Sequence, residues 1–200
     1  MLNGNVLCWG HSPELRIKFI CTNGEKESIM TANITPGRAA VIRRSQPADR
    51  DDILEIYASA RRFMRESGNP AQWGDFFPPE ELIREDIRLG LGYVCEFDGR
   101  IQGVFAMIPG DDPTYQVIEG AWLNDRPYCA VHRVASRRER RGVAREILAW
   151  CLKQCGNIRI DTHEDNLPMQ RVLERCGFSK CGRIWVEDGS PRIAYQKTLE

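Results

Sequence analysis

The chain has 200 residues, with 28 basic against 28 acidic side chains and a sequence pI near 6.8. This length fits one domain with a sizeable core, and the balanced charge argues against general attraction to nucleic acid or to an anionic membrane. The sequence contains no run of about 18 apolar residues, so it predicts no transmembrane helix. The first residues lack the basic start and the apolar stretch of a signal peptide.

Residues 1–38 lack sustained hydrophobic periodicity and carry scattered Gly, Asn, Thr and Ser. We expect them to form an N-terminal appendage, poorly ordered in one interpretation, and residues 39–200 to form the functional domain. Met30 stands shortly before the periodic sequence begins. Translation from Met1 and translation from Met30 are therefore alternative interpretations.

From residue 39 onward, segments with strand and helix patterns follow one another. Residues 39–45 predict a short strand, and residues 51–67 predict an amphipathic helix that Gly68 ends. The aromatic and proline-rich loop NPAQWGDFFPP, residues 69–79, leads to a second helix that begins near Pro79. Two further strands, residues 92–97 and 101–108, flank Asp98–Gly99, a dipeptide favoured in tight hairpins.

The second half of the domain alternates strands and helices. A long connection, residues 109–128, leads to the predicted strand CAVHRVA at 129–135. The next helix carries apolar residues at positions 144, 147, 148, 151, 152 and 155, which define one buried face. A strand at 157–162, a short helix ended by Gly177 and a hairpin around Asp188–Gly189 complete the domain.

Five arginines surround the start of the helix that follows the strand at 129–135, at positions 137, 138, 140, 141 and 145. A helix start presents unpaired N–H groups and the positive end of the helix dipole, so it binds anions, above all phosphates. Gly142 would let the backbone approach a phosphate, and flanking arginines add charge-assisted hydrogen bonds. A solvated basic surface is the alternative interpretation.

Together with RIDTHEDNLPMQRVLERCGF at 159–178, this helix start resembles the GCN5-related N-acetyltransferase (GNAT) family. The family's helix-opening loop reads Gln or Arg, two residues, Gly, one residue, then Gly or Ala. Gly142 and Ala144 match this pattern, whereas Glu139 stands where the family has Gln or Arg. Asn166 matches a later family element, whereas Leu173 stands where a tyrosine commonly serves as general acid.

The resemblance covers about residues 41–197 and implies an α/β fold with a twisted mixed sheet of about seven strands, flanked by about four helices. It also implies acetyl-CoA as cosubstrate, lying where the fourth and fifth strands splay apart. The residues expected to contact acetyl-CoA are Val134 and Ala135 through their backbone, Arg140, Arg141, Gly142, Val143, Ala144 and Arg145 around the pyrophosphate, and Asn166.

Acetylation of an amine requires a base that removes a proton. By strand alternation, His132 lies on the same face as Val134, and its ordinary pKa suits a base near neutral pH. A histidine hydrogen-bonded to its sheet neighbours is the alternative interpretation. Glu119, in the apolar run VIEGAWL, is the rival base because desolvation would raise its pKa. A charge at the rim of the site is the alternative for Glu119.

These patterns predict a cytoplasmic N-acetyltransferase that transfers an acetyl group directly to a primary amine in a ternary complex. The acceptor would be a small molecule or a peptide. Residues 113–128, with Tyr115, Trp122 and Tyr128, and residues 72–79 are expected to form walls of the acceptor pocket. The sequence does not decide whether the protein forms a homodimer or whether the donor carries an acyl chain longer than acetyl. We interpret the eight cysteines as reduced packing thiols.

Two other classes of function are weighed against this prediction. Asp161, His163 and Asp165 alternate in DTHED and could hold a divalent metal for hydrolysis. One histidine among carboxylates is a weak metal motif, however, and no metal site is expected. The departures at Glu139 and Leu173 also suit a module that binds acyl-CoA without catalysis, acting as a sensor.

Overall fold

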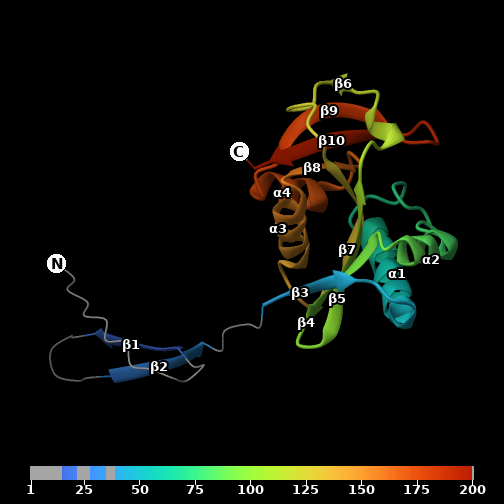
Figure 1. Cartoon of the computed structure of the whole chain (residues 1–200). Coiled ribbons are helices and arrows are strands. Elements are labelled where there is room, and N and C mark those ends of the chain that lie inside the picture. The colour runs from blue at the N-terminus through green and yellow to red at the C-terminus, as the bar shows by residue number, and fades with distance from the viewer. Residues whose placement is uncertain (1–14, 22–27, 35–38, 200) are drawn as a thin grey trace. The chain divides into compact units, whose positions relative to one another are not determined.

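A computed structural model describes residues 15–21, 28–34 and 39–199 and divides the chain into two compact units, residues 1–39 and 40–200 (Figure 1). In the first unit, β1 (Leu15–Cys21) pairs with β2 (Ser28–Ile34) in an antiparallel hairpin. The sequence analysis predicted no strand there. The appendage was predicted over residues 1–38, of which residues 1–14, 22–27 and 35–38 lie outside the described residues.

The second unit is built around one mixed sheet of eight strands, in the order β3-β4-β5-β7-β8-β10-β9-β6. This confirms the predicted α/β fold with four helices and adds one strand to the seven expected. The strands are β3 (Val41–Arg44), β4 (Gly92–Phe97), β5 (Arg100–Pro109), β6 (Glu119–Gly120), β7 (Cys129–Ser136), β8 (Asn157–Thr162), β9 (Ser179–Trp185) and β10 (Pro191–Thr198).

Four helices cover the two faces of this sheet. They are α1 (Arg50–Glu66), α2 (Glu80–Leu89), α3 (Val143–Cys155) and α4 (Leu167–Arg175), with short 3-10 helices η1 (Pro47–Asp49) and η2 (Pro113–Tyr115). Helices α1 and α2 lie on one face, and α3 and α4 lie on the other (Figure 1). No helix in the described part of the chain is long and apolar enough to cross a membrane.

The additional strand, β6, consists of two residues that pair with β9. Gly120 of β6 lies opposite Gly182 of β9, and a Cβ atom on Gly120 would stand 2.3 Å from the carbonyl oxygen of Cys181. Only glycine allows the two backbones to approach this closely. Because two residues carry no periodic pattern, the sequence shows only a long connection at this place.

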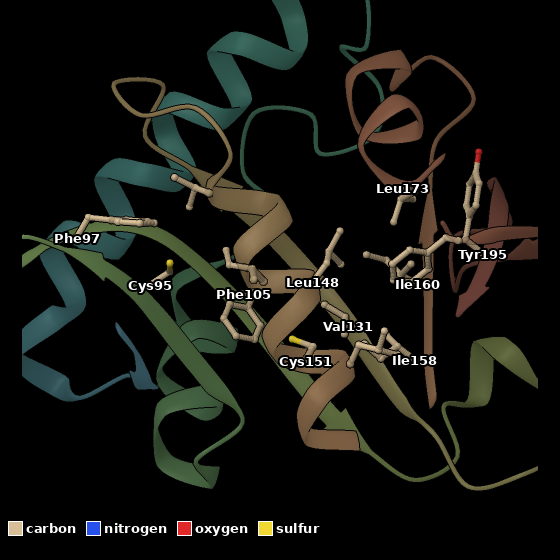
Figure 2. Close-up of a cluster of buried hydrophobic side chains, with 14 residues drawn as sticks. Cys95, Phe97, Phe105, Val131, Leu148, Cys151, Ile158, Ile160, Leu173 and Tyr195 are labelled. Carbon is tan, nitrogen blue, oxygen red and sulfur yellow. The ribbon is translucent and has the colours of Figure 1, made fainter. Parts of the chain in front are cut away.

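The main hydrophobic core lies between α3 and the sheet (Figure 2). Val131 of β7, Leu148 of α3 and Ile158 of β8 are each no more than 1 % exposed. Leu173 of α4, at the position where the family commonly has a tyrosine, is fully buried in the same cluster. Burial of such side chains contributes roughly 1.5–3 kcal/mol each, and it anchors α3 and α4 against β7 and β8.

β7 and β8 run parallel but pair only at their first residues. The two paired positions are Cys129 with Ile158 and Ala130 with Arg159. Beyond Ala130 no residue of β7 pairs with β8, so the backbone edge of β7 that faces β8 is free of ladder hydrogen bonds over its second half. The splayed strands that the family resemblance implied are thus present.

A β-bulge interrupts β7 within this second half. Ala106 of β5 lies opposite His132, whereas Val104 lies opposite Ala135, so β7 carries one extra residue. Val131 and Val134 therefore both pack towards α3, while the ring of His132 lies 5.7 Å from that of Tyr115, centroid to centroid. The expectation that His132 and Val134 share one face is wrong, because the bulge breaks the alternation of side chains.

The bulged residue is Arg133, which adopts a left-handed backbone conformation with φ of +55°. Its guanidinium Nη2 donates to both carboxylate oxygens of Asp86 in α2, at 2.8 Å each. The two side chains are only 10 % and 11 % exposed. Burial raises the pKa of Asp86, and the positive charge of Arg133 opposes that rise. This buried ion pair ties the bulge to α2.

We predict that Asp86→Ala lowers the free energy of unfolding by about 3 kcal/mol, because it leaves the charge of Arg133 buried without a partner. Urea denaturation followed by circular dichroism measures the change. Glu85→Ala is the matched control, since it removes the neighbouring, 46 % exposed partner of Arg88 and should cost less than about 1 kcal/mol. Equal losses in the two variants would show that the buried pair does not hold the bulge.

Candidate active site

A cavity of about 1200 Å³ follows the gap between β7 and β8. Its walls come from β7 and β8, the loop before α3, the first turns of α3 and α4, the loop between α1 and α2, and the turn between β9 and β10. This volume exceeds that of a typical small-ligand site.

One end of the cavity lies at the start of α3. Gly142 precedes the first helical residue with φ of +86°, and a Cβ atom there would meet no other atom within 4 Å. The first N–H groups of a helix have no partner within the helix. Gly142 thus leaves the positive end of α3 open to an anion. Ala144, in the first turn, lines the cavity.

Four arginines before α3 line the cavity: Arg137, Arg138, Arg140 and Arg141. The guanidinium of Arg138 lies 3.8 Å from the ring centroid of Phe63, and that of Arg140 lies 3.9 Å from the ring centroid of Phe97. Stacking on an aromatic ring orients a guanidinium while leaving its N–H groups free at the edge. The predicted residues Arg140 and Arg141 both line the cavity.

Two arginines of the cluster, Arg137 and Arg145, form ion pairs with carboxylates of helices α1 and α3. Arg137 is buried, and its Nη2 donates to the carboxylates of Asp52 at 2.6 Å and Glu55 at 2.7 Å. It therefore ties the end of β7 to α1. Arg145 is exposed, pairs with Glu146 and does not line the cavity. The structure thus gives no direct sign of the cofactor contact predicted for Arg145.

The remaining residues predicted to contact the cofactor would do so through their backbone groups or, for Asn166, through the side-chain amide. Val134 and Ala135 line the cavity along the free edge of β7. The side chain of Val143 is buried in the core, which leaves its N–H group as the part available to a ligand. Asn166 lines the cavity, but its Oδ1 accepts from the backbone N–H of Met169 and its Nδ2 donates to Gln72.

Glu139 departs from the family pattern and points elsewhere. Its carboxylate binds the guanidinium of Arg100, the first residue of β5, at 2.7 Å in an exposed ion pair. This ion pair keeps a negative charge from facing a phosphate near Gly142. The departure is therefore compatible with an anion site at the start of α3.

The other end of the cavity holds a network around His132. Its Nε2 lies 2.7 Å from Oδ2 of Asp112, and its Nδ1 lies 3.9 Å from Oδ1 of Asp161. The hydroxyl of Tyr115 donates to Asp161 Oδ1 at 2.8 Å, and both the N–H and the hydroxyl of Thr114 donate to Asp112 Oδ1. His132, Asp112 and Asp161 all line the cavity.

Two pKa values in this network are displaced. Burial alone would raise the pKa of Asp112, but the hydrogen bonds from His132 and Thr114 outweigh it and lower the pKa to about 2. Burial, with the nearby charge of Asp161, raises the pKa of Tyr115. At neutral pH, Asp112 is therefore an anion that can only accept hydrogen bonds, and Tyr115 keeps its proton and donates to Asp161.

Glu119, the second candidate base, lies in β6 with its side chain exposed, and it does not line the cavity. The desolvation expected for it is not present. The aromatic residues of the same connection stand behind the site: Arg159 stacks on both Trp122 and Tyr128, and Trp122 donates to the carbonyl of Tyr115. From the loop expected as another wall, Gln72, Trp73, Gly74 and Phe77 do line the cavity.

The residues weighed for a metal site do not converge. Asp161 faces His132 and Tyr115, whereas Nδ1 of His163 accepts from the backbone N–H of Asp165. Within residues 39–199, no three His, Cys, Asp or Glu side chains gather as metal ligands would. Six cysteines of this segment are free thiols, and Cys8 and the side chain of Cys21 lie outside the description.

Asp112 was not singled out in the sequence. It stands in GDDPT, where an aspartate before Pro and Thr is typical of a turn, and it does cap η2. Asp161 was considered only as a metal ligand. Their common place beside His132 depends on long-range pairing of β5, β7 and β8, which no local pattern reveals.

The sequence matches the model of the acetyltransferase (GNAT) family over residues 51–178. A GNAT family acetyltransferase from Streptococcus agalactiae of known structure is 32% identical, with a TM-score of 0.75 over 82% of this chain and 98% of that one. A GNAT family acetyltransferase from Listeria monocytogenes is 22% identical, with a TM-score of 0.60 over 80% of this chain and 95% of that one. No curated protein shows significant similarity.

The fold is also shared by the protein yncA from Salmonella typhimurium, whose solved structure includes its cofactor acetyl-CoA. That protein is 19% identical, with a TM-score of 0.54 over 82% of this chain and 95% of that one. From the family match and the Streptococcus agalactiae structure, the chain belongs to the GNAT acetyltransferase family. Acetyl-CoA is the cosubstrate of this family. The open start of α3, the arginines and the free edge of β7 fit such a molecule.

We predict that Asp112→Asn lowers the free energy of unfolding at pH 7 by about 2 kcal/mol, the equivalent of the pKa depression. Because the folded-state pKa lies below the unfolded one, this stability is present above about pH 4 and is lost as the pH falls towards 2. Urea denaturation at several pH values should show the gap between wild type and variant shrinking to about half by pH 3. Asp111→Asn, at an exposed neighbour, should leave both curves unchanged.

Proposed function

We propose that this protein transfers an acetyl group from acetyl-CoA directly to a primary amine of a small molecule or peptide, without a covalent enzyme intermediate. One observation carries the proposal: a single cavity joins an anion site at the start of α3 to His132, along a strand edge that β8 leaves unpaired. We infer that the reaction takes place in the cytoplasm, in keeping with the free cysteines.

The residues that would hold the cosubstrate lie in sequence along this path. The backbone of Val134 and Ala135 offers hydrogen bonds to the pantetheine amides, in place of the missing pairing with β8. The N–H groups from Gly142 to Arg145, together with Arg140 and Arg141, bind the pyrophosphate. Asn166 shapes the neighbouring wall, since its own amide is already bonded to Gln72.

When bound, acetyl-CoA supplies a thioester carbonyl, whose C–S bond breaks as the acceptor nitrogen forms the new C–N bond. His132 accepts a proton from the acceptor, which must be neutral to attack. Backbone N–H groups along the edge of β7 that β8 leaves unpaired would stabilise the negative charge that develops on the carbonyl oxygen. Leu173 is buried and apolar, so the thiolate leaves without a proton from that position.

We predict that Gly142→Glu abolishes CoA binding, because a carboxylate would stand where the backbone must meet phosphate. Isothermal calorimetry measures the affinity. Gly99→Glu is the matched control: Gly99 also has a positive φ, +75°, and open space around its missing Cβ, but it lies in the hairpin between β4 and β5. Both variants should lose similar stability. Unchanged CoA affinity in Gly142→Glu would remove the start of α3 as the phosphate site.

We predict that His132→Gln spares acetyl-CoA affinity and lowers kcat by about 100- to 10,000-fold, because glutamine keeps polarity but cannot take up a proton near neutrality. The loss should shrink at high pH, where more of the acceptor is already neutral. The measurement is thiol release against pH over a panel of amines. His163→Gln, outside the cavity, should match wild type. A wild-type pH profile in His132→Gln would make the histidine structural.

If no amine releases thiol from acetyl-CoA in the presence of the wild-type protein, the proposed transfer is wrong. In that case a chain that still binds CoA would be the non-catalytic module considered from the sequence. The thiol assay therefore separates the two functions directly.

A further inference from the structure

The acceptor end of the cavity is chemically distinctive, because two mostly buried carboxylates flank one histidine. We propose that Asp161 and His132 together seat the acceptor as a primary alkylammonium ion that carries an apolar or aromatic group. In this arrangement Asp112 is a positioning residue for His132. The identity of the acceptor rests on the proposed transferase function, whereas the binding of an alkylammonium ion can be measured without it.

Asp112 determines which nitrogen of His132 is free. Oδ1 of Asp112 already accepts from the N–H of Thr114 at 2.9 Å and from its hydroxyl at 2.5 Å. Oδ2 stands 2.7 Å from Nε2 of His132. Because an ionised carboxylate can only accept, Nε2 must carry the proton of this hydrogen bond. In the neutral imidazole, the lone pair then lies on Nδ1.

A hydrogen-bond donor can fit between the lone pair on Nδ1 of His132 and the carboxylate of Asp161. Nδ1 lies 3.9 Å from Oδ1 of Asp161, too far for a direct hydrogen bond. Oδ1 accepts from the hydroxyl of Tyr115, and Oδ2 accepts from no residue in the described part of the chain. An ammonium group has three N–H donors. One can reach Nδ1 while others reach the carboxylate of Asp161.

The two carboxylates beside this place favour a cation. The side chains of Asp112 and Asp161 are each 12 % exposed, so water screens them weakly. Arg133, next to His132 in β7, is neutralised by Asp86, and Tyr115 is held in its neutral form. A positively charged acceptor therefore gains attraction here that a neutral amine or an alcohol of the same shape does not.

Part of the cavity wall is apolar. Met64 of α1, Trp73 and Phe77 of the following loop and Leu82 of α2 line the cavity. The hydrogen bond from Asn166 to Gln72 ties this loop to the junction that follows β8, the strand that carries Asp161. The group attached to the ammonium therefore meets aromatic and aliphatic side chains. An alkylammonium with an aromatic group matches both parts of the site.

The transfer step balances with these groups. Nδ1 of His132 takes one proton from the ammonium, and the freed lone pair attacks the thioester carbon. As the C–N bond forms and the C–S bond breaks, the nitrogen loses its second proton, and the departing thiolate takes up one proton. Asp161 takes no proton in this step and holds the nitrogen in place.

The first experiment determines the tautomer of His132 by NMR of protein with ¹⁵N-labelled histidine, with the signals assigned through His132→Gln. We expect the neutral ring to carry its proton on Nε2, and Asp112→Asn to shift the population towards the other tautomer. A neutral ring protonated on Nδ1 in the wild type would overturn the proposal.

The second experiment compares two probes, 2-phenylethylammonium and 2-phenylethanol, by calorimetry on protein saturated with CoA. The ammonium should bind the wild type more tightly, since its aliphatic amine stays charged at neutral pH. Asp161→Asn keeps an acceptor for Tyr115 and should weaken ammonium binding by roughly tenfold or more, the range of a lost charged hydrogen bond. Binding of the alcohol should not change, which shows that the variant is folded.

The matched control is Asp165→Asn, which removes an exposed carboxylate four residues away and outside the cavity. It should bind both probes as the wild type does. Equal ammonium affinity in Asp161→Asn and wild type, or a wild type that prefers the alcohol, would overturn the proposal. Ammonium binding without thiol release from acetyl-CoA would support the seat and contradict the transferase function, so the two failures are distinguishable.

Discussion

The structure of the site depends on one constraint, the loss of pairing between β7 and β8 beyond Ala130. Parallel strands normally exchange evenly spaced hydrogen bonds along their whole length. Here the core side chains of α3 hold both strands at their start, and the bulge at Arg133 turns β7 away from a regular ladder. The unsatisfied backbone edge that results is what a ligand with amide groups can complete.

Charge is distributed along the cavity in two opposite groups. The arginines and the positive end of α3 lie where β7 ends, whereas Asp112 and Asp161 lie at the level of His132. The chain as a whole has no net charge, yet this cavity offers a cationic and an anionic end. In the proposed reaction, two substrates of opposite charge would occupy different ends of this cavity.

The sequence predicted the α/β fold and its four helices, because strong periodicity, Pro79 and the Asp98–Gly99 turn are local signals that the structure keeps. It also placed Gly142 at the start of α3. It missed β6, which is too short for a pattern, and it put His132 and Val134 on one face because a bulge leaves no local signature. Asp112 was missed because its role arises only when distant strands pair.

Asn166 has a further structural consequence. One amide both begins α4 and, through Gln72, holds the aromatic loop that covers the acceptor end. This hydrogen bond connects the start of α4 to the loop between α1 and α2, two segments almost a hundred residues apart in the chain. Phe77, at 39 % exposure, can change in size at a smaller cost than Gln72, whose side chain holds the loop to the start of α4. The loop is therefore fixed near Gln72 and less constrained around Phe77.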